Sequence, residues 1–583
     1  MLAFGRHGSV GELLSTDTSD AEAVIAEVAR AGIDVEALAE ELQIKGRDSF
    51  DDSFAKLLQS IETKAATLRE AQGREAEFLG PVAAAADAAQ ADLSGRGAIR
   101  RIWSLDYTLW DSDPTEISNR IGWLVSPHQM EEQVEDLEAF TKELKDGGFT
   151  HVLWSGMGGS SLFPQVLRQA FGDGAGGLDL RVLDTSDPGT VHRHAEELPA
   201  DKTLFVFASK SGGTLEPRSH LAFFWDRIGR PEQFAVVTDP GTELDRLATE
   251  QGFRRVFRAN PNLGGRYSAL SHFGIVAGAL LGVDIGELLR RAGAVIAAVG
   301  ACVPPERNPG LRLGAVLGAA AKGGRDKCTL VIPEEIAAFG MWLEQLIAES
   351  TGKRGVGILP VAGEDLGPPE VYGNDRIFVS LGRQDRLDAL VAVGQPVVQL
   401  DYVDRFSIGA EVVRWEYAIA MAGAVLGINP FNQPNVEAAK QAAAKVLEEG
   451  MPNIPVEPAE AVLGTVKPGD YIAIQAFIDT ASPDIPALQR ARMALRDQYR
   501  VATTVGIGPR YLHSTGQLHK GGAASGVFLQ IVGDDPVDVA IPGRPFGFSQ
   551  LKQAQAAGDY LALKDKGRRV ARVARDEILQ YGQ

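Results

Sequence analysis

The feature that most constrains this chain is a repeated alternation of short apolar runs and helical stretches that begins near Phe149. The apolar runs, with the turn-forming residues that follow them, are THVLWSGMGGSS, LDLRVLDTSDPG, KTLFVFASKSGGT, EQFAVVTDPG and RRVFRANPN. Helical patterns such as PQVLRQAFG and RSHLAFFWDRIG lie between them. This alternation predicts an α/β fold, in which helices cover both faces of a parallel sheet.

The same pattern restarts in the second half of the chain, in KCTLVIP, RGVGILPV, DRIFVSLG and QPVVQLDY, and we place the boundary near residues 301–310. We therefore predict a helical segment over 1–75 and two doubly wound domains over 76–303 and 304–583, the second with a C-terminal extension. In that extension DYIAIQAFI and GVFLQIVG are predicted strands, and GPRYLHSTGQLHKGGAASG is a long loop of the kind that is functional or disordered. Ligands of such sheets bind outside the carboxyl ends of the strands.

Charge and composition exclude several classes of partner. The chain has 58 lysines and arginines against 77 aspartates and glutamates, a formal charge of −19, which argues against nucleic acid and anionic membranes. No apolar stretch approaches the roughly 20 residues that span a bilayer. The N-terminus also lacks the basic and apolar regions of an export signal. Cys302 and Cys328 are too few for a disulfide framework or a metal cluster. We expect a cytoplasmic protein without a metal site.

Two glycine- and serine-rich turns carry the first functional signal. SGMGGSS (residues 155–161) and SKSGGT (residues 209–214) each follow a predicted strand and precede a predicted helix. Free backbone N–H groups and the positive end of the helix dipole favour an anion there, and glycine lets it approach closely. The residues predicted to bind a phosphate group are Gly159, Ser160, Ser209, Lys210, Ser211, Gly212 and Thr214.

Ordinary helix capping is the alternative interpretation of either turn alone. Two such turns in one sheet favour an anion site. A phosphotransferase is disfavoured, because neither turn has the spacing of a P-loop or ends in a GK[ST] triplet.

Five segments occur in the order SGMGGSSLFP, SKSGGTLEP, GGRYSALSHFG, LEQLIAESTGKRG and GINPFNQPNVEAAK. Together they resemble the glucose-6-phosphate isomerase family, from about residue 100 to about residue 440. The resemblance implies two sugar isomerase domains, a sugar-phosphate substrate, no cofactor, and interconversion of glucose 6-phosphate and fructose 6-phosphate through a cis-enediolate. Two alternatives stay open: a non-catalytic sugar-phosphate-binding regulator, and an isomerase that also accepts mannose 6-phosphate.

The resemblance also assigns roles to individual residues. Glu349, in AESTGK, matches the family's base, which carries a proton between adjacent carbons. Arg266, in GGRYS, matches the arginine that stabilises the enediolate, and Lys440 matches a lysine that takes part in ring opening. Gln345 and Gln433 match substrate contacts. Without the resemblance, solvated side chains and a structural ion pair would be the default interpretations.

The family's ring-opening histidine, which a neighbouring subunit contributes, has no counterpart between Ser350 and Lys440. His513 and His519 in HSTGQLHKGG are the predicted replacements, with Lys520 as an alternative cation in the same loop. We take His513 as the catalytic candidate, although either histidine can instead hold a long loop in place. Family members are mostly dimers, and without the subunit-crossing histidine a homodimer is possible here rather than required.

The N-terminal region carries a second resemblance. LAFGRHGSVGELL, followed by IDVEALAEELQIKGRDSFDDSFAKLLQSI, resembles the C-terminal end of transaldolases over about the first 70 residues. The isomerase branch that is fused behind transaldolase would account for both resemblances. We expect a remnant without transaldolase chemistry, because the barrel strands and the Schiff-base lysine of that family are absent. Its helical periodicity is interrupted at Gly32 and Gly46.

Overall fold

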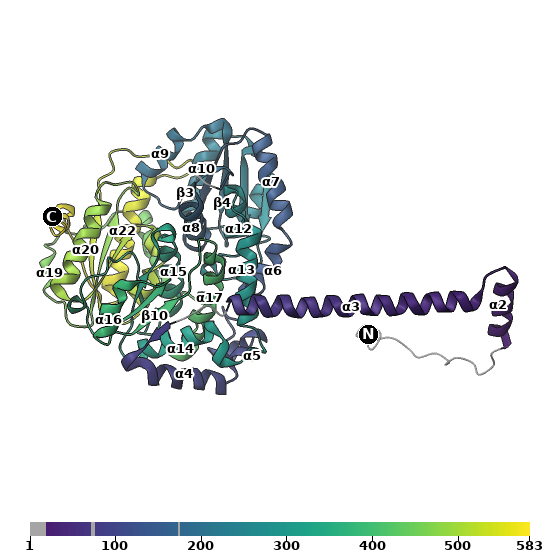
Figure 1. Cartoon of the computed structure of the whole chain (residues 1–583). Helices are drawn as coiled ribbons and strands as arrows, with labels where there is room; N and C mark the ends of the chain where they lie inside the picture. Colours follow the sequence, from purple (N-terminus) through teal and green to yellow (C-terminus); the bar gives the residue numbers. More distant parts are fainter. Residues whose placement is uncertain (1–18, 72–75, 173–174) are drawn as a thin grey trace. The chain divides into compact units, whose positions relative to one another are not determined.

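The computed structural model describes residues 19–71, 76–172 and 175–583, and the chain divides into two compact units, 1–69 and 70–583. The first unit contains α2 (Ser19–Arg30) and nearly all of α3 (Val35–Ala71), so the N-terminal helical segment is confirmed (Figure 1). The expected break at Gly32 is present, in a turn with φ of +84°. The break expected at Gly46 is wrong, because α3 continues through it, and one glycine costs a helix only about 1 kcal/mol. The segment LAFGRHGSVGELL lies outside the described residues.

The first sheet of the larger unit is parallel, as predicted, with the strand order β3-β2-β4-β5-β6. Its strands are β2 (His151–Ser155), β3 (Asp179–Leu183), β4 (Thr203–Ala208), β5 (Phe234–Thr238) and β6 (Arg255–Arg258). The connecting helices are α8 (Leu162–Phe171), α9 (Pro188–Glu197), α10 (Leu215–Ile228) and α11 (Glu243–Glu250). Strands β3 and β4 lie on opposite sides of β2, so the carboxyl ends of β2 and β4 form the switch point at which such sheets bind ligands. The two glycine- and serine-rich turns follow these two strands.

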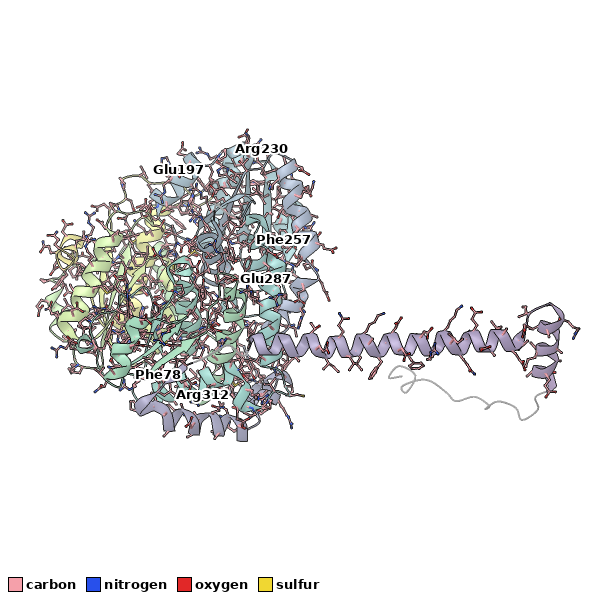
Figure 2. All side chains as sticks on the ribbon, viewed as in Figure 1. Phe78, Glu197, Arg230, Phe257, Glu287 and Arg312 are labelled. Carbon is pink, nitrogen blue, oxygen red and sulfur yellow. The ribbon has the colours of Figure 1, made fainter. Side chains whose placement is uncertain are left out.

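The second sheet has the order β1-β10-β9-β7-β8. Its strands are β1 (Ala76–Phe78), β7 (Lys327–Val331), β8 (Leu359–Val361), β9 (Arg376–Leu381) and β10 (Val397–Leu400). The four predicted strands are present, and β1, antiparallel to β10, was not predicted because its residues, AEF, form no apolar run. Arg312, labelled in Figure 2 together with Phe78, pairs with Glu77 at 2.7 Å and Asp87 at 2.9 Å. Strand β1 thus belongs to the second sheet, although it precedes all strands of the first sheet in the sequence.

The C-terminal extension builds a third sheet, also parallel, with the order β12-β11-β13-β14. Its strands are β11 (Tyr471–Phe477), β12 (Ala502–Ile507), β13 (Gly526–Val532) and β14 (Arg569–Arg572). The sequence predicted β11 and β13. Phe548 and Leu551, from α22 (Phe548–Asp565), join Phe205 and Phe207 of β4 in one buried cluster. The extension therefore completes the core of the first domain.

The other helices complete the layers around these sheets (Figure 1). They are α4 (Ala83–Gly95), α5 (Ala98–Trp103), α6 (Ser126–Glu131), α7 (Val134–Asp146), α12 (His272–Leu281), α13 (Ile285–Ala298), α14 (Pro309–Lys322), α15 (Phe339–Thr351), α16 (Asp388–Ala392), α17 (Ser407–Leu426), α18 (Pro434–Glu449), α19 (Glu460–Leu463), α20 (Ile485–Tyr499), α21 (Gly516–Gly521) and α23 (Arg575–Gln580). Among the described residues, no helix has both the length and the apolar character needed to cross a membrane.

Helices α14 and α17 pack at unusually short range. A Cβ atom on Gly314 would lie 2.4 Å from the carbonyl oxygen of Ala418 and 2.7 Å from Cβ of Met421. One turn away on either side, Gly310 and Gly318 leave equally little room for a side chain. This glycine face allows the buried helix α17 to approach α14 closely.

We predict that Gly314→Ala destabilises the protein by about 1–3 kcal/mol, because the added methyl group meets a backbone carbonyl that cannot move alone. Urea unfolding measures the change. Gly95→Ala is the matched control, because a Cβ atom there would have no neighbour within 4 Å, and it should leave stability unchanged or slightly raised. Equal stability of the two variants would contradict the packing argument.

Candidate active site

A cavity of 490 Å³ lies beside the turns that follow β2 and β4, and we call it the central cavity. It brings together all of the predicted site residues except Ser209 and Gly212. The predicted residues that line it are Gly159, Ser160, Lys210, Ser211, Thr214, Arg266, Gln345, Glu349, Gln433, Lys440 and His513. Segments more than 350 residues apart in the sequence, from Gly159 to His513, therefore meet in one place.

Helix α15 contributes Gln345 and Glu349, which are one turn apart and both buried. The Gln345 side-chain amide donates from Nε2 to Glu349 Oε2 at 3.0 Å and to the His513 carbonyl at 2.9 Å. The solvated alternative for Glu349 is wrong, because only 4% of this residue is exposed. Within the described part of the chain, Gln345 Oε1 is buried and accepts no hydrogen bond, so it remains open to a donor such as a sugar hydroxyl.

Arg266 is the buried cation of the cavity and carries five N–H donors. Four hydrogen bonds hold it, to Ser350 Oγ at 2.8 Å, Gln433 Oε1 at 3.0 Å, Pro430 O at 2.8 Å and Asn432 O at 2.8 Å. Its Nη1 also lies 3.3 Å from Glu349 Oε1. The guanidinium is therefore fixed in orientation beside the carboxylate.

Gly159 acts through close packing in this structure. A Cβ atom at this position would lie 2.0 Å from the Gly265 carbonyl oxygen and 3.0 Å from the Arg266 nitrogen. Ser268 Oγ bridges the two segments: it donates to Gly265 O at 2.6 Å and also lies 3.4 Å from Gly159 O. The turn after β2 thus sets the position of the backbone that carries Arg266.

The turn after β4 contributes two hydroxyl groups, those of Ser211 and Thr214, to the cavity. Ser209 Oγ instead donates to Thr214 Oγ1 at 3.1 Å, and the Gly212 N–H donates to Ser209 O at 3.2 Å. Both residues shape the turn from within. Lys210 lines the cavity, but its Nζ pairs with Asp239 and donates to Pro261 O at 3.2 Å. Its charge is therefore largely neutralised by Asp239.

His513 enters the cavity from the loop after β12. Its Nε2 lies 2.9 Å from Oε1 of Glu216, which is buried in the first turn of α10. Gln555 of α22 donates to the same Oε1 at 2.7 Å and accepts from Ser186 Oγ at 2.5 Å. Burial alone would raise the pKa of Glu216, but His513, a backbone N–H and the charge of Lys440 together outweigh burial and lower this pKa to about 2. The carboxylate is ionised and orients the imidazole.

This chain is similar in sequence to known isomerases. A sequence profile described as phosphoglucose isomerase matches residues 125–359. A glucose-6-phosphate isomerase of Synechococcus sp. (strain JA-3-3Ab) is 30% identical over 379 residues, which cover 54% of this chain and 70% of that protein. This chain belongs to the glucose-6-phosphate isomerase family. Another glucose-6-phosphate isomerase, from Prochlorococcus marinus (strain NATL2A), is 28% identical over 373 residues, covering 54% of this chain and 71% of the relative.

Two crystal structures share the fold. One is a hypothetical protein from Thermus thermophilus, with a TM-score of 0.55 and 22% identity over 64% of this chain and 100% of its own. The other is a glucose-6-phosphate isomerase from Chlamydia trachomatis, with a TM-score of 0.54 and 19% identity over 62% of this chain and 86% of its own.

Lys440 and His513 lie beyond the residues that the family profile matches. The likeness of the N-terminal residues to transaldolases and the proposed domain boundaries stay predictions.

His519 and Lys520, the two alternatives to His513, lie away from the central cavity. His519 is 3% exposed, with its Nδ1 3.0 Å from the Tyr471 hydroxyl and its ring against Phe528. Lys520 Nζ forms a buried ion pair with Asp559 at 2.5 Å. His519 holds the loop against the third sheet and Lys520 holds it against α22, so His513 is the residue among these three that lines the cavity together with Glu349.

Sequence reasoning missed Glu116, Asn119, Arg120 and Asp239, which also line the cavity. Asp239 follows β5 and was detectable as a polar residue at a strand's carboxyl end. The other three lie in TEISNR, ahead of the first sheet, where no pattern in the sequence points to the site. Over the described ranges, no three His, Cys, Asp or Glu side chains are arranged to hold a metal ion.

We predict that Gly159→Ala lowers turnover by on the order of 100-fold, because the methyl group displaces the backbone that positions Arg266. Steady-state kinetics with glucose 6-phosphate measures the loss. Gly213→Ala is the matched control in the other turn, since nothing lies within 4 Å of its Cβ position, and it should leave turnover little changed. Similar kinetics for both variants would argue against this role of Gly159.

We predict opposite effects for the two histidines. His513→Gln should lower turnover by a much larger factor than it lowers stability, because the Gln amide can still donate to Glu216, whereas His519→Gln should lower stability with little effect on turnover. Burial, with the charges of Lys520 and Arg568, lowers the pKa of His519 to about 3. Below about pH 6.5, His519 therefore binds a proton in the unfolded chain but not in the folded chain.

Wild-type stability should consequently fall as the pH drops from about 6.5 towards 3, by on the order of a few kcal/mol from this group alone. In His519→Gln this part of the pH dependence is absent, so the gap between the two proteins narrows at acid pH. Urea unfolding at a series of pH values measures it, and a gap that widens instead would contradict the assignment.

Proposed function

We propose that this chain is an aldose–ketose isomerase that interconverts glucose 6-phosphate and fructose 6-phosphate. The observation that carries the proposal is the placement of one buried carboxylate, Glu349, beside one buried guanidinium, Arg266, in a cavity that also receives two hydroxyl-rich turns. Membership of the glucose-6-phosphate isomerase family supports it. The reaction needs these three parts: a base, an oxyanion partner and a grip on the distant phosphate.

In the proposed mechanism the phosphate is held by the turns after β2 and β4. Ser160, Ser211 and Thr214 supply hydroxyl donors. Thr214 stands at the N-cap position of α10 without a side-chain capping bond, and the positive end of the helix dipole faces the turn. Binding of the phosphate group holds the sugar in place, so that C1 and C2 at its other end lie next to the catalytic groups. Gln345 Oε1, the acceptor without a partner in the described chain, suits a sugar hydroxyl.

Glu349 transfers the proton. It removes the hydrogen from C2 of the open-chain aldose and returns it to C1, so a single carboxyl group serves as base and then as acid. Negative charge develops on the enediolate oxygens during this transfer. Arg266 faces that charge with a guanidinium that stays protonated and that four hydrogen bonds already hold in place.

Ring opening precedes proton transfer and requires a proton for the ring oxygen. His513 is our candidate donor, because Glu216 holds its Nε2 and Gln555 holds Glu216. Lys440, exposed at the mouth of the cavity, is the second candidate cation. Both ring-opening candidates come from the same chain as Glu349, so a homodimer is a further proposal that this site does not require.

No organic cofactor or metal takes part in this scheme, since protein side chains supply its chemistry: Glu349 and the ring-opening candidates transfer the protons, and Arg266 stabilises the developing charge. We also propose a cytoplasmic location. A sugar-phosphate dianion does not cross a bilayer unaided, because burying its charge in hydrocarbon is very costly. The enzyme must therefore share a compartment with its substrate.

We predict that Glu349→Gln lowers turnover on the order of a thousandfold or more, because the amide keeps the shape and loses the base. Exchange of solvent deuterium into C2 of glucose 6-phosphate should fall in parallel. Glu334→Gln, at an exposed position outside the cavity, is the matched control and should exchange like the wild type. The unfolding midpoint of each variant shows whether lost exchange reflects lost structure.

The same exchange experiment separates the isomerase from a sugar-phosphate sensor. A sensor binds glucose 6-phosphate and leaves its C2 hydrogen in place. Wild-type protein that binds the substrate without exchanging this hydrogen would refute the proposed function.

A further inference from the structure

Among the described residues, the central cavity is lined by four lysine and arginine side chains, and two of them, Arg266 and Lys210, already lie against carboxylates. Arg266 lies against Glu349, and His513 lies against Glu216. Lys210, which the sequence predicted as a phosphate-binding residue, is paired with Asp239. Burial raises the pKa of Asp239, and the charges of Lys210 and Arg120 oppose this rise. A phosphate dianion in the turn therefore needs another positive charge.

Arg120 is the residue placed to supply that charge. It lines the same cavity as Ser211, Thr214 and Asp239, and its charge acts on the Asp239 carboxyl group. Within the described chain, its guanidinium makes one hydrogen bond, from Nη1 to Asn119 O at 3.1 Å, and one loose ion pair, from Nη2 to Glu116 at 3.8 Å. A guanidinium has five N–H donors, so most of its donor capacity is uncommitted.

The backbone after Arg120 is fixed to the segment that leads to Arg266. Ile121 forms an antiparallel bridge with Leu263, and the Gly122 N–H donates to Asn262 O at 2.9 Å. The ring of Trp123 stacks on Tyr267, with ring centroids 5.6 Å apart. Arg120 thus has a rigid anchor beside the catalytic arginine, while its side chain keeps 22% of its surface exposed.

The residue that holds Arg120 loosely is itself strained. Glu116 has φ of +54°, a left-handed conformation that a residue with a side chain adopts at a cost of about 1 kcal/mol or more. Such strain persists where the surroundings impose it, and it is common at ligand sites. Here it places a carboxylate where it can hold the guanidinium without a close ion pair.

We propose that Arg120 is a substrate-binding residue, whose guanidinium leaves Glu116 and contacts the phosphate group of the bound sugar phosphate. This inference rests on the proposed function for the identity of the ligand. It assigns to an arginine ahead of the first sheet the charge that Lys210 cannot supply alone. Arginine suits the task because its planar fork can donate two parallel hydrogen bonds to one phosphate.

Binding of inorganic phosphate tests the proposal without depending on turnover. Isothermal titration calorimetry at low ionic strength should show that Arg120→Gln weakens phosphate binding by about 10- to 100-fold, the loss of one charge-assisted contact. In steady-state kinetics the same variant should raise KM for glucose 6-phosphate far more than it lowers kcat. Arg120→Lys keeps the charge and loses the fork, so it should fall between Arg120→Gln and wild type.

Two further variants complete the design. Arg227→Gln removes a positive charge at the end of α10, outside the cavity, and should bind phosphate like the wild type. Glu116→Gln removes the competing carboxylate and should bind phosphate at least as tightly as the wild type. Weaker binding by Glu116→Gln, or unchanged binding by a folded Arg120→Gln, would overturn the inference.

The outcomes also separate this inference from the proposed function. A wild type that isomerises glucose 6-phosphate, with phosphate binding indifferent to Arg120, overturns the inference alone. A wild type without isomerase activity, whose phosphate binding still depends on Arg120, supports the inference and counts against the proposed function.

Discussion

The buried guanidinium of Arg266 is the constraint on which the site depends. A cation taken out of water is costly unless its donors are satisfied and an opposite charge lies close by. Here the hydrogen-bond acceptors come from α15 and from residues 430–433. Gly159 lets its turn pack closely against the backbone of Gly265 and Arg266. These segments must therefore converge for the domain to be stable. The same convergence places Glu349 in the cavity, so folding and assembly of the catalytic pair are one event.

The C-terminal extension is part of the site rather than an addition to it. Its third sheet points the carboxyl end of β12 towards the first domain, and the loop there carries His513. A bidentate ion pair fixes this loop, because Arg510 donates from two nitrogens to Asp184 at 2.7 Å each. Glu216 is then held between the extension's His513 and Gln555. Residues far outside the family profile thus provide groups that the proposed ring opening requires.

Much of the fold was predictable because parallel strands that are buried on both faces leave a strong local signal. Most strands of the first two sheets were predicted, but β1 and half of the third sheet were missed, since very short or partly polar strands carry little periodicity. Of the site, the family motifs identified Glu349 and Arg266. They gave no indication that Lys210 is neutralised by Asp239, or that Arg120 lines the same cavity as Arg266, because both depend on which loops meet across strand ends.

The sequence by itself determined the α/β architecture, the two hydroxyl-rich turns and the position of Glu349 on a helix, since each of these depends on residues that are close together in the chain. Only the tertiary structure decided which of two histidines enters the cavity, because His513 and His519 are close in sequence but lie in two short helices that pack against different neighbours. It also decided which cations remain free for an anion. Charge neutralisation is a property of distances between segments, and a linear pattern does not contain those distances.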